Sequence, residues 1–195
     1  MIKISNKIVP TKIEDRFIEI LNSPNFPWFY LDNVMHNNIA STVVNKNITK
    51  SYALVHTLLD KGIVSSDYYD LFNSILTRFC VINKIKLDRV LRVRIRRTFY
   101  VKGHTNQKYN IPHVDIIDEL PYKTLIYYVD DSDGDTVFFK NKLKKENFLD
   151  ANAVIDKKVT PKKGTVVYFN GDKYHSGNCP IDFTKRTVIN FDFKI

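Results

Sequence analysis

The chain has 195 residues, which is one domain's length and enough to bury a sizeable core. Hydrophobic residues make up 44% and charged residues 26%, a composition that excludes a disordered chain. The formal net charge of +9 fits either an acidic partner or a Lys-rich surface, and we favour the surface. The sequence shows no secretory signal and no stretch as long as a membrane span. Its two cysteines do not form a disulfide framework, so we expect a cytoplasmic protein.

The first part of the chain, residues 1–87, has mainly helical periodicity. Apolar residues recur at helical spacing in 11–21 and again from about 65 to 81. Between them, residues 26–31 have the aromatic composition of a strand. We therefore expect 1–87 to be mostly helical and to support the rest of the fold.

From residue 88 the pattern changes to short strands separated by turns. The expected strands are 91–96, 109–117, 123–130, 136–139, 153–159, 165–169 and 186–194. Many short strands between turns favour a sandwich or a barrel, of which the jelly roll is one form. The sequence thus predicts a mainly β, α+β protein, one domain over 1–195 with its β core in 88–195.

A possible metal site begins with His113 and Asp115. Two residues apart on a predicted strand, they project from the same face. His175, which follows another predicted strand and a turn, can supply a third ligand. Two histidines and one carboxylate form the facial triad of non-haem Fe(II) oxygenases, which leaves positions open for a cosubstrate and dioxygen. A His-x-Asp triplet alone is commonplace, so the assignment depends on the surrounding pattern.

The last predicted strand offers a group that can bind a carboxylate. Arg186 and Asn190 share one face of it, and a guanidinium presents a planar fork to a carboxylate. Lys185 faces the opposite way and is a second candidate. Tyr128, on the predicted strand 123–130, can add a hydroxyl. Periodicity alone also allows an outward polar face here, and a core or surface position for the tyrosine.

Several motifs occur in an order that resembles the 2-oxoglutarate/Fe(II)-dependent dioxygenases, especially the prolyl-4-hydroxylase-like branch. His113-Val114-Asp115 comes first, and the strand, acidic turn and Gly-x-Thr segment of 124–136 follow. The segment 161–169 then leads to His175-Ser176-Gly177, and Arg186 stands on the final strand. Each piece is weak alone, but four in this order are specific. The resemblance covers roughly residues 90 to 195.

This resemblance implies a double-stranded β-helix, which is a jelly-roll barrel. It implies that His113, Asp115 and His175 hold Fe(II). It also implies that 2-oxoglutarate chelates this iron and that dioxygen is the second cosubstrate. Arg186 would bind the C5 carboxylate of 2-oxoglutarate, with Tyr128 and Asn190 beside it. Several prolyl hydroxylases of the branch use Lys there, so Lys185 remains open as the anchor. The implied reaction is hydroxylation of a substrate C–H bond.

The substrate remains open among three alternatives. The first is a peptide or protein side chain, such as proline, which the resemblance favours. The second is nucleic acid or a small molecule, suggested by the net charge and by Arg92, Arg94 and Arg96, which share one strand face. We expect that arginine stripe to be a solvated outer face instead. The third is a jelly-roll binding module without catalysis, which the complete ligand set argues against.

Two further expectations concern the metal and the substrate. A zinc hydrolase with the same three ligands is conceivable, but it gives Arg186 no role. Substrate recognition in such folds lies in loops, and the segments 102–108 and 141–150 are the candidates.

Overall fold

The structure is a computed structural model that describes residues 2–32, 51–105, 107–141 and 153–195. Its described part is mainly β, with two antiparallel sheets and two α-helices. The large sheet has the order β1 (Lys3–Ser5), β9 (Val166–Asn170), β6 (Lys123–Tyr128), β11 (Lys185–Lys194), β5 (Arg89–Phe99), β3 (Ala53–Asp60) and β2 (Phe29–Leu31), with β4 (Ile63–Val64) paired to β3. The small sheet has the order β10 (His175–Gly177), β7 (Thr136–Phe139) and β8 (Ile155–Val159). Neither sheet closes on itself among the described strands.

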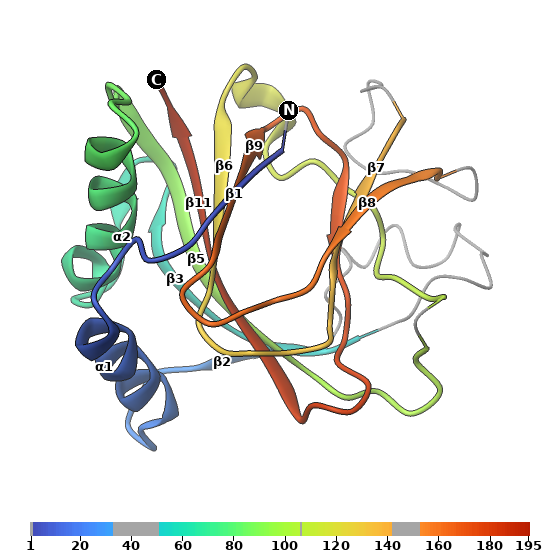
Figure 1. Cartoon of the computed structure of the whole chain (residues 1–195). Coiled ribbons are helices and arrows are strands. Elements are labelled where there is room, and N and C mark those ends of the chain that lie inside the picture. The colour runs from blue at the N-terminus through green and yellow to red at the C-terminus, as the bar shows by residue number, and fades with distance from the viewer. Residues whose placement is uncertain (1, 33–50, 106, 142–152) are drawn as a thin grey trace.

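The two helices, α1 (Thr11–Asn22) and α2 (Tyr69–Ile82), cover one face of the large sheet, and the small sheet lies on the other side (Figure 1). Strand alternation explains this arrangement, because successive side chains of a strand point to opposite faces. On β5, Val93 and Ile95 join the core against the helices, and on β11 Ile189 and Phe191 do the same. Each central strand therefore has one apolar face under the helices and one face toward the small sheet.

A second buried cluster lies between the two sheets. It contains side chains of β6, β7, β8, β9 and β11 with the neighbouring strand ends, namely Ile126, Tyr128, Phe138, Val159, Val167, Phe169 and Val188. The residues from β6, β9 and β11 lie on the face of the large sheet opposite to the helices, and Phe138 and Val159 come from the small sheet. Burial of this apolar surface holds the small sheet against the large one.

Most of the strands expected after residue 88 are confirmed. β5 to β9 and β11 occupy the predicted places, within a few residues at the ends. The expected strand 109–117 is wrong, because the chain there is irregular and makes an isolated bridge between His113 and His175. Pro112 has no N–H to donate to a strand ladder, and a short 3-10 helix begins at Ile117.

The described part of residues 1–87 contains strands as well as the expected helices. Both predicted helices are present, but β3 lies between them and is a full neighbour of β5 in the large sheet. Its sequence, ALVHTLLD, has two short apolar runs on either side of His56 and Thr57, so it lacks the alternation that reveals a half-buried strand. The aromatic strand expected at 26–31 is confirmed in its second half as β2.

Three other observations bear on the sequence-based expectations. In the described part of the chain, neither helix is long and apolar enough to cross a membrane. Cys80 and Cys179 are both free and buried. Apart from Asn141, the loop 141–150 that was expected to recognise substrate lies outside the described residues.

Candidate metal centre

The two histidines of the predicted triad meet through their backbones. His113 donates its N–H to the carbonyl of His175 at 2.9 Å, and His175 donates back at 3.0 Å. This antiparallel bridge ties the irregular segment before Asp115 to β10 of the small sheet. It places the two imidazole rings 4.9 Å apart, centroid to centroid.

Asp115 completes the cluster. Its Oδ2 lies 3.3 Å from Nε2 of His175, and its Oδ1 lies 3.8 Å from Nε2 of His113. One ligand atom from each of the three residues lies within 4.8 Å of the others. The structure therefore brings together the three predicted ligands, although His113 and Asp115 do not belong to a regular strand.

Both imidazoles are oriented by hydrogen bonds on their far side. Nδ1 of His113 is 2.9 Å from the carbonyl of Ile111, and Nδ1 of His175 is 3.1 Å from the carbonyl of Lys173. A carbonyl oxygen accepts a hydrogen bond, so each Nδ1 carries the proton. Each Nε2 then presents a lone pair toward the shared point, which is the arrangement that metal-binding histidines use.

The protonation states also suit metal binding. Burial, together with the neighbouring His175, lowers the pKa of His113 to about 4, which keeps the ring neutral. Burial alone would raise the pKa of Asp115, but the positive charge of Arg92 holds it well below its usual range. A neutral imidazole and an ionised carboxylate are the forms that bind a metal ion.

Two residues of the large sheet hold the Asp115 carboxylate. Nη2 of Arg92 lies 2.5 Å from Oδ1, and Nδ2 of Asn190 donates to Oδ2 at 3.1 Å. Arg92 also pairs with Asp192, whose other oxygen accepts a hydrogen bond from Thr124 at 2.8 Å. Burial, with the nearby charge of Asp115, raises the pKa of Asp192 to about 7. These contacts fix the carboxylate before any metal arrives.

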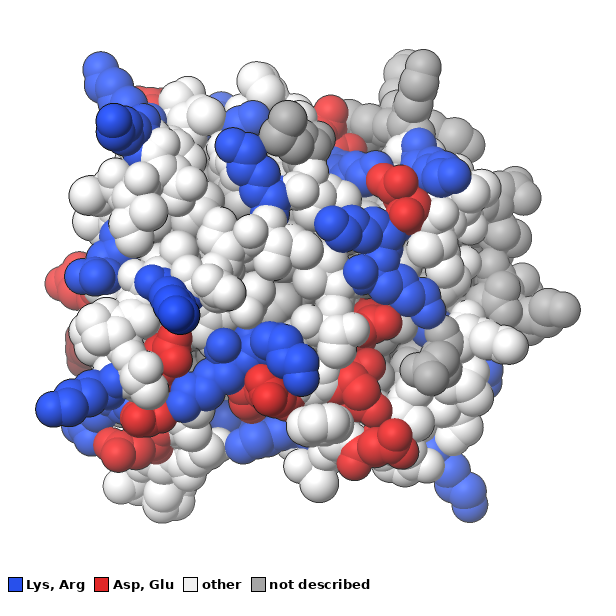
Figure 2. Space-filling model, in the orientation of Figure 1, with Lys and Arg blue, Asp and Glu red and all other residues white. Residues whose placement is uncertain are grey.

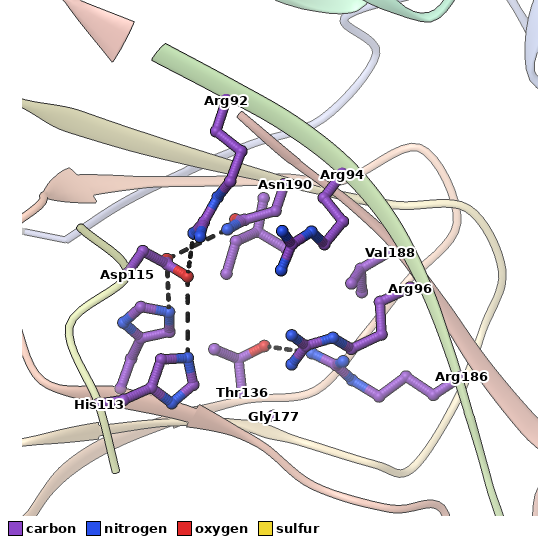
Figure 3. Close-up of a pocket in the computed structure, with 12 residues that line it drawn as sticks. Arg92, Arg94, Arg96, His113, Asp115, Thr136, Gly177, Arg186, Val188 and Asn190 are labelled. Atoms are coloured by element: carbon purple, nitrogen blue, oxygen red, sulfur yellow. Dashed lines mark hydrogen bonds and ion pairs between the residues drawn. The ribbon is translucent and has the colours of Figure 1, made fainter. Parts of the chain in front are cut away.

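The triad lies at one side of a pocket between the two sheets (Figure 3). Strands β5, β6 and β11 of the large sheet, β7 and β10 of the small sheet and the irregular segment around His113 line the pocket. The lining residues are Arg92, Arg94, Arg96, His113, Asp115, Ile126, Thr136, His175, Gly177, Arg186, Val188 and Asn190. Its wall carries an unusual concentration of guanidinium groups, with a small apolar surface from Ile126 and Val188.

Arg186 lies in this pocket, across from the metal ligands, and is 3% exposed. Its Nη2 donates to Oγ1 of Thr136 at 2.8 Å, and the hydroxyl of Tyr128 donates to the same oxygen at 2.7 Å. Nε of Arg186 is buried without a hydrogen-bond partner in the described structure. Because Thr136 accepts two hydrogen bonds, its own O–H remains available as a donor.

Two glycines make room for the Arg186 side chain. A Cβ atom at Gly177 would lie 2.9 Å from Nη1 of Arg186, and one at Gly134 would lie 2.9 Å from its Cδ. Both distances are closer than a carbon atom tolerates, so the chain leaves a cradle that a side chain would fill. Arg186 is thus held in place by backbone shape as well as by Thr136.

The residues around Arg186 differ in part from the sequence-based expectation. Lys185, the alternative anchor, lies outside the pocket and donates from Nζ to Oδ1 of Asn22. Tyr128 is fully buried; its ring centroid lies 5.8 Å from Cζ of Arg186, and its hydroxyl donates to Thr136. Asn190 lies in the pocket but contacts Asp115, so its place is at the metal ligands. Binding of a carboxylate by any of these residues stays a prediction.

No family model and no curated protein matches the sequence. Solved structures do match. A 2OG-Fe(II) oxygenase family oxidoreductase from Burkholderia pseudomallei is 10% identical, with a TM-score of 0.64 over 99% of this chain and 84% of that chain. A Trichoplax adhaerens prolyl hydroxylase, solved with a hypoxia inducible factor peptide fragment, is 10% identical, with a TM-score of 0.61 over 99% and 83%. The epimerase SnoN, solved with Fe3+, alpha ketoglutarate and nogalamycin RO, is 10% identical, with a TM-score of 0.63 over 99% and 78%.

The chain has the fold of the 2-oxoglutarate/Fe(II) oxygenases. In this oxygenase fold, the expectation about the arginine stripe is wrong. Arg92, Arg94 and Arg96 do not form a solvated outer face but line the pocket. The other face of β5 is apolar and packs against the helices. A strand of a sheet packed on both sides has no solvated face, and the alternation of one strand does not reveal a second packed layer.

Thr136, Arg92 and the two glycines of the cradle were also missed as parts of the site. Thr136 and Gly134 lie in the acidic turn and Gly-x-Thr segment of 124–136, so the segment was found but not the role of its residues. Arg92 could have been found from its pairing, because β5 and β11 lie side by side and Arg92 is opposite Asp192. That pairing needed knowledge of which strands are neighbours.

Proposed function

We propose that this protein is an Fe(II)- and 2-oxoglutarate-dependent dioxygenase that hydroxylates a C–H bond of its substrate. The observation that carries this is one pocket that holds a His-Asp-His cluster and, across from it, a buried arginine. Within the described residues, Arg186 forms no ion pair with a carboxylate. A structural arginine so deeply buried would normally be paired.

The cluster fits ferrous iron. His113, His175 and Asp115 supply two imidazole nitrogens and one carboxylate oxygen, which is the donor set of non-haem Fe(II) sites with open positions. The hydrogen bonds on both Nδ1 atoms and the contacts of Arg92 and Asn190 with Asp115 hold the donors in the binding form. The same donors could bind zinc, but a zinc hydrolase leaves Arg186 unexplained.

The opposite wall fits 2-oxoglutarate. Arg186 and the free O–H of Thr136 would bind its C5 carboxylate, because a guanidinium and a hydroxyl are both donors to carboxylate oxygens. Ile126 and Val188 offer apolar surface for its methylene groups. Tyr128 would act from behind, since its hydroxyl fixes the oxygen of Thr136.

When bound, Fe(II) with 2-oxoglutarate and dioxygen would supply oxidative decarboxylation coupled to hydroxylation. The protein's own residues have other tasks. His113, Asp115 and His175 hold the metal, and Arg186 with Thr136 orients the cosubstrate. Arg92 keeps the Asp115 carboxylate ionised and in place. The enclosing sheets limit the access of water to the pocket.

Two of the similar structures support two different substrate classes. A peptide side chain such as proline fits the Trichoplax prolyl hydroxylase, which was solved with a peptide fragment. A small molecule fits SnoN, which was solved with nogalamycin RO. The main argument for a nucleic-acid substrate was the arginine stripe, and it no longer holds because the stripe faces the pocket. On the face shown in Figure 2, Lys and Arg are interspersed with Asp and Glu.

We also infer that the two sheets form a jelly-roll barrel in a single domain over residues 1–195. The pocket between them draws its lining from both sheets, and the similar oxygenase structures cover nearly the whole chain. The location is proposed as cytoplasmic, which agrees with two free cysteines.

Calorimetric titration of 2-oxoglutarate into the protein, with and without Mn(II) as a stand-in for ferrous iron, tests the proposed chemistry. We expect one equivalent of 2-oxoglutarate to bind, and to bind far more tightly when the metal is present. Absence of binding, or equal affinity without metal, would contradict the proposed function.

A further inference from the structure

The pocket contains more positive charge than the proposed chemistry uses. Four arginines line it, Arg92, Arg94, Arg96 and Arg186, and the carboxylate that lines it is that of Asp115, with Asp192 behind Arg92. Arg92 makes ion pairs with both of these carboxylates. Among the described residues, Arg94, Arg96 and Arg186 form no ion pair with an acidic side chain.

Iron and 2-oxoglutarate would not remove this excess. Ferrous iron brings two positive charges and 2-oxoglutarate two negative ones, so together they leave the charge of the lining unchanged. One arginine, Arg186, would be matched by the C5 carboxylate. Arg94 and Arg96 would remain without an anion in the loaded pocket.

Arg94 and Arg96 are placed to meet a third molecule. They alternate with core residues on β5, opposite Asn190 and Val188 of β11, and their guanidinium groups point into the pocket toward the side of the metal ligands (Figure 3). Arg94 lies beside Asn190, which itself holds Asp115. Nε of Arg94 is buried without a hydrogen-bond partner in the described structure.

Keeping these charges together is unfavourable without an anion. Burial and then the positive charge of Arg94 lower the pKa of Arg96 to about 10, because both disfavour its charged form. A neutral apolar substrate, such as a prolyl ring, would cover both guanidinium groups and leave them unpaired. A carboxylate or a phosphate would satisfy them with charge-assisted hydrogen bonds.

We infer that the substrate carries an oxyanion, a carboxylate or a phosphate, which Arg94 and Arg96 bind next to the metal ligands, an assignment that rests on the function proposed above. The oxidised C–H bond then belongs to an acidic molecule or to a residue with an acidic group. The negative group of the substrate would then contact β5, and the C5 carboxylate of 2-oxoglutarate would bind separately at Arg186.

The test uses the whole protein, loaded with Fe(II) and saturating 2-oxoglutarate in the absence of oxygen. The visible charge-transfer band first shows that the complex has formed. Sodium propionate, inorganic phosphate and neutral propionamide are then titrated at constant ionic strength, and binding is measured by calorimetry. Propionate and propionamide differ in charge but hardly in shape, and phosphate distinguishes the two oxyanion sources. The variants are Arg94→Gln and Arg96→Gln.

Arg89→Gln is the matched control, because it removes the same charge from the same strand at its exposed end, where Arg89 pairs with Glu119. We expect propionate or phosphate to bind the loaded wild-type protein, and propionamide not to bind. Affinity for that oxyanion should fall by about tenfold or more in Arg94→Gln and Arg96→Gln, because each loses charge-assisted hydrogen bonds. Arg89→Gln should bind like the wild type.

Three results would overturn the inference. The first is that neither oxyanion binds although the charge-transfer band is present; the proposed function then survives and the acidic substrate does not. The second is that propionamide binds as well as propionate, which makes charge irrelevant. The third is that Arg94→Gln and Arg96→Gln weaken the binding of 2-oxoglutarate itself, which assigns both arginines to the cosubstrate. If the band does not form at all, the proposed function fails first.

Discussion

Nη2 of Arg92 lies 2.5 Å from Oδ1 of Asp115, so the guanidinium that holds the predicted metal ligand comes from β5 of the large sheet. The same Nη2 lies 2.9 Å from Oδ2 of the fully buried Asp192. Arg92 is therefore the cation that lies between these two carboxylates. Its removal would leave both acids facing each other without a counter-charge.

Arg92→Gln is expected to destabilise the metal-free protein. Breaking a buried ion pair from one side costs about 3–5 kcal/mol, because an uncompensated charge stays buried. The free energy of unfolding, measured with urea, should fall by an amount of this order. Arg89→Gln removes an exposed arginine of the same strand and should change stability little. Equal stability of the two variants would show that Arg92 is not an essential counter-charge.

Arg186→Gln is expected to weaken 2-oxoglutarate binding to the metal-loaded protein. Loss of one partner of a buried charge pair costs about 2–5 kcal/mol, which is at least about 30-fold in affinity. Lys185→Gln is the control, because Lys185 contacts Asn22 outside the pocket. Calorimetry of both variants decides the anchor. A loss in Lys185→Gln with normal binding in Arg186→Gln would reverse the assignment.

Gly177→Ala is expected to disturb the proposed site of the 2-oxoglutarate carboxylate without removing a hydrogen-bond donor. The new Cβ would meet Nη1 of Arg186 at 2.9 Å, and the guanidinium must shift because the neighbouring backbone is fixed. Affinity for 2-oxoglutarate should fall by roughly tenfold or more, since small displacements of a binding group are costly. Metal affinity and melting temperature should stay near the wild-type values. Unchanged binding of 2-oxoglutarate would mean that the cradle does not position Arg186.

Asn190→Ala separates two roles for this amide. The sequence suggested a place beside the cosubstrate, whereas in the structure Asn190 donates to Asp115. Loss of a group that orients a metal ligand typically lowers metal affinity about 10–100-fold. We expect Mn(II) to bind more weakly, and 2-oxoglutarate to bind normally once the metal is saturating. Weaker 2-oxoglutarate binding at full metal occupancy would restore the role suggested by the sequence.

The parts of the site that the sequence predicted depend on local spacing. His113, Asp115 and His175 were found from their residue types and order, and strand parity favoured Arg186 over Lys185, which stayed open as the anchor. Parity works there because β11 is central in the large sheet and keeps one register with β5 from Lys185 to Asp192. The predicted strand around His113 was wrong, yet the ligand pair survived, because the backbone bridge to His175 holds it.

The parts that the sequence did not predict depend on contacts between distant segments. Whether Arg94 and Arg96 face solvent or a pocket is decided by the small sheet, which β5 itself does not encode. The role of Thr136 needs both Arg186 and Tyr128 nearby. β3 was missed because a strand buried on most of its length lacks alternation.

The most direct test of the central claim is the visible spectrum of the protein with Fe(II) and 2-oxoglutarate in the absence of oxygen. Chelation of ferrous iron by the keto acid should give a weak charge-transfer band, which requires no knowledge of the substrate. We expect the band in the wild-type protein and its loss in His113→Ala. A protein with proven iron occupancy that shows no band, or a His113→Ala variant that keeps it, would contradict the proposed oxygenase site.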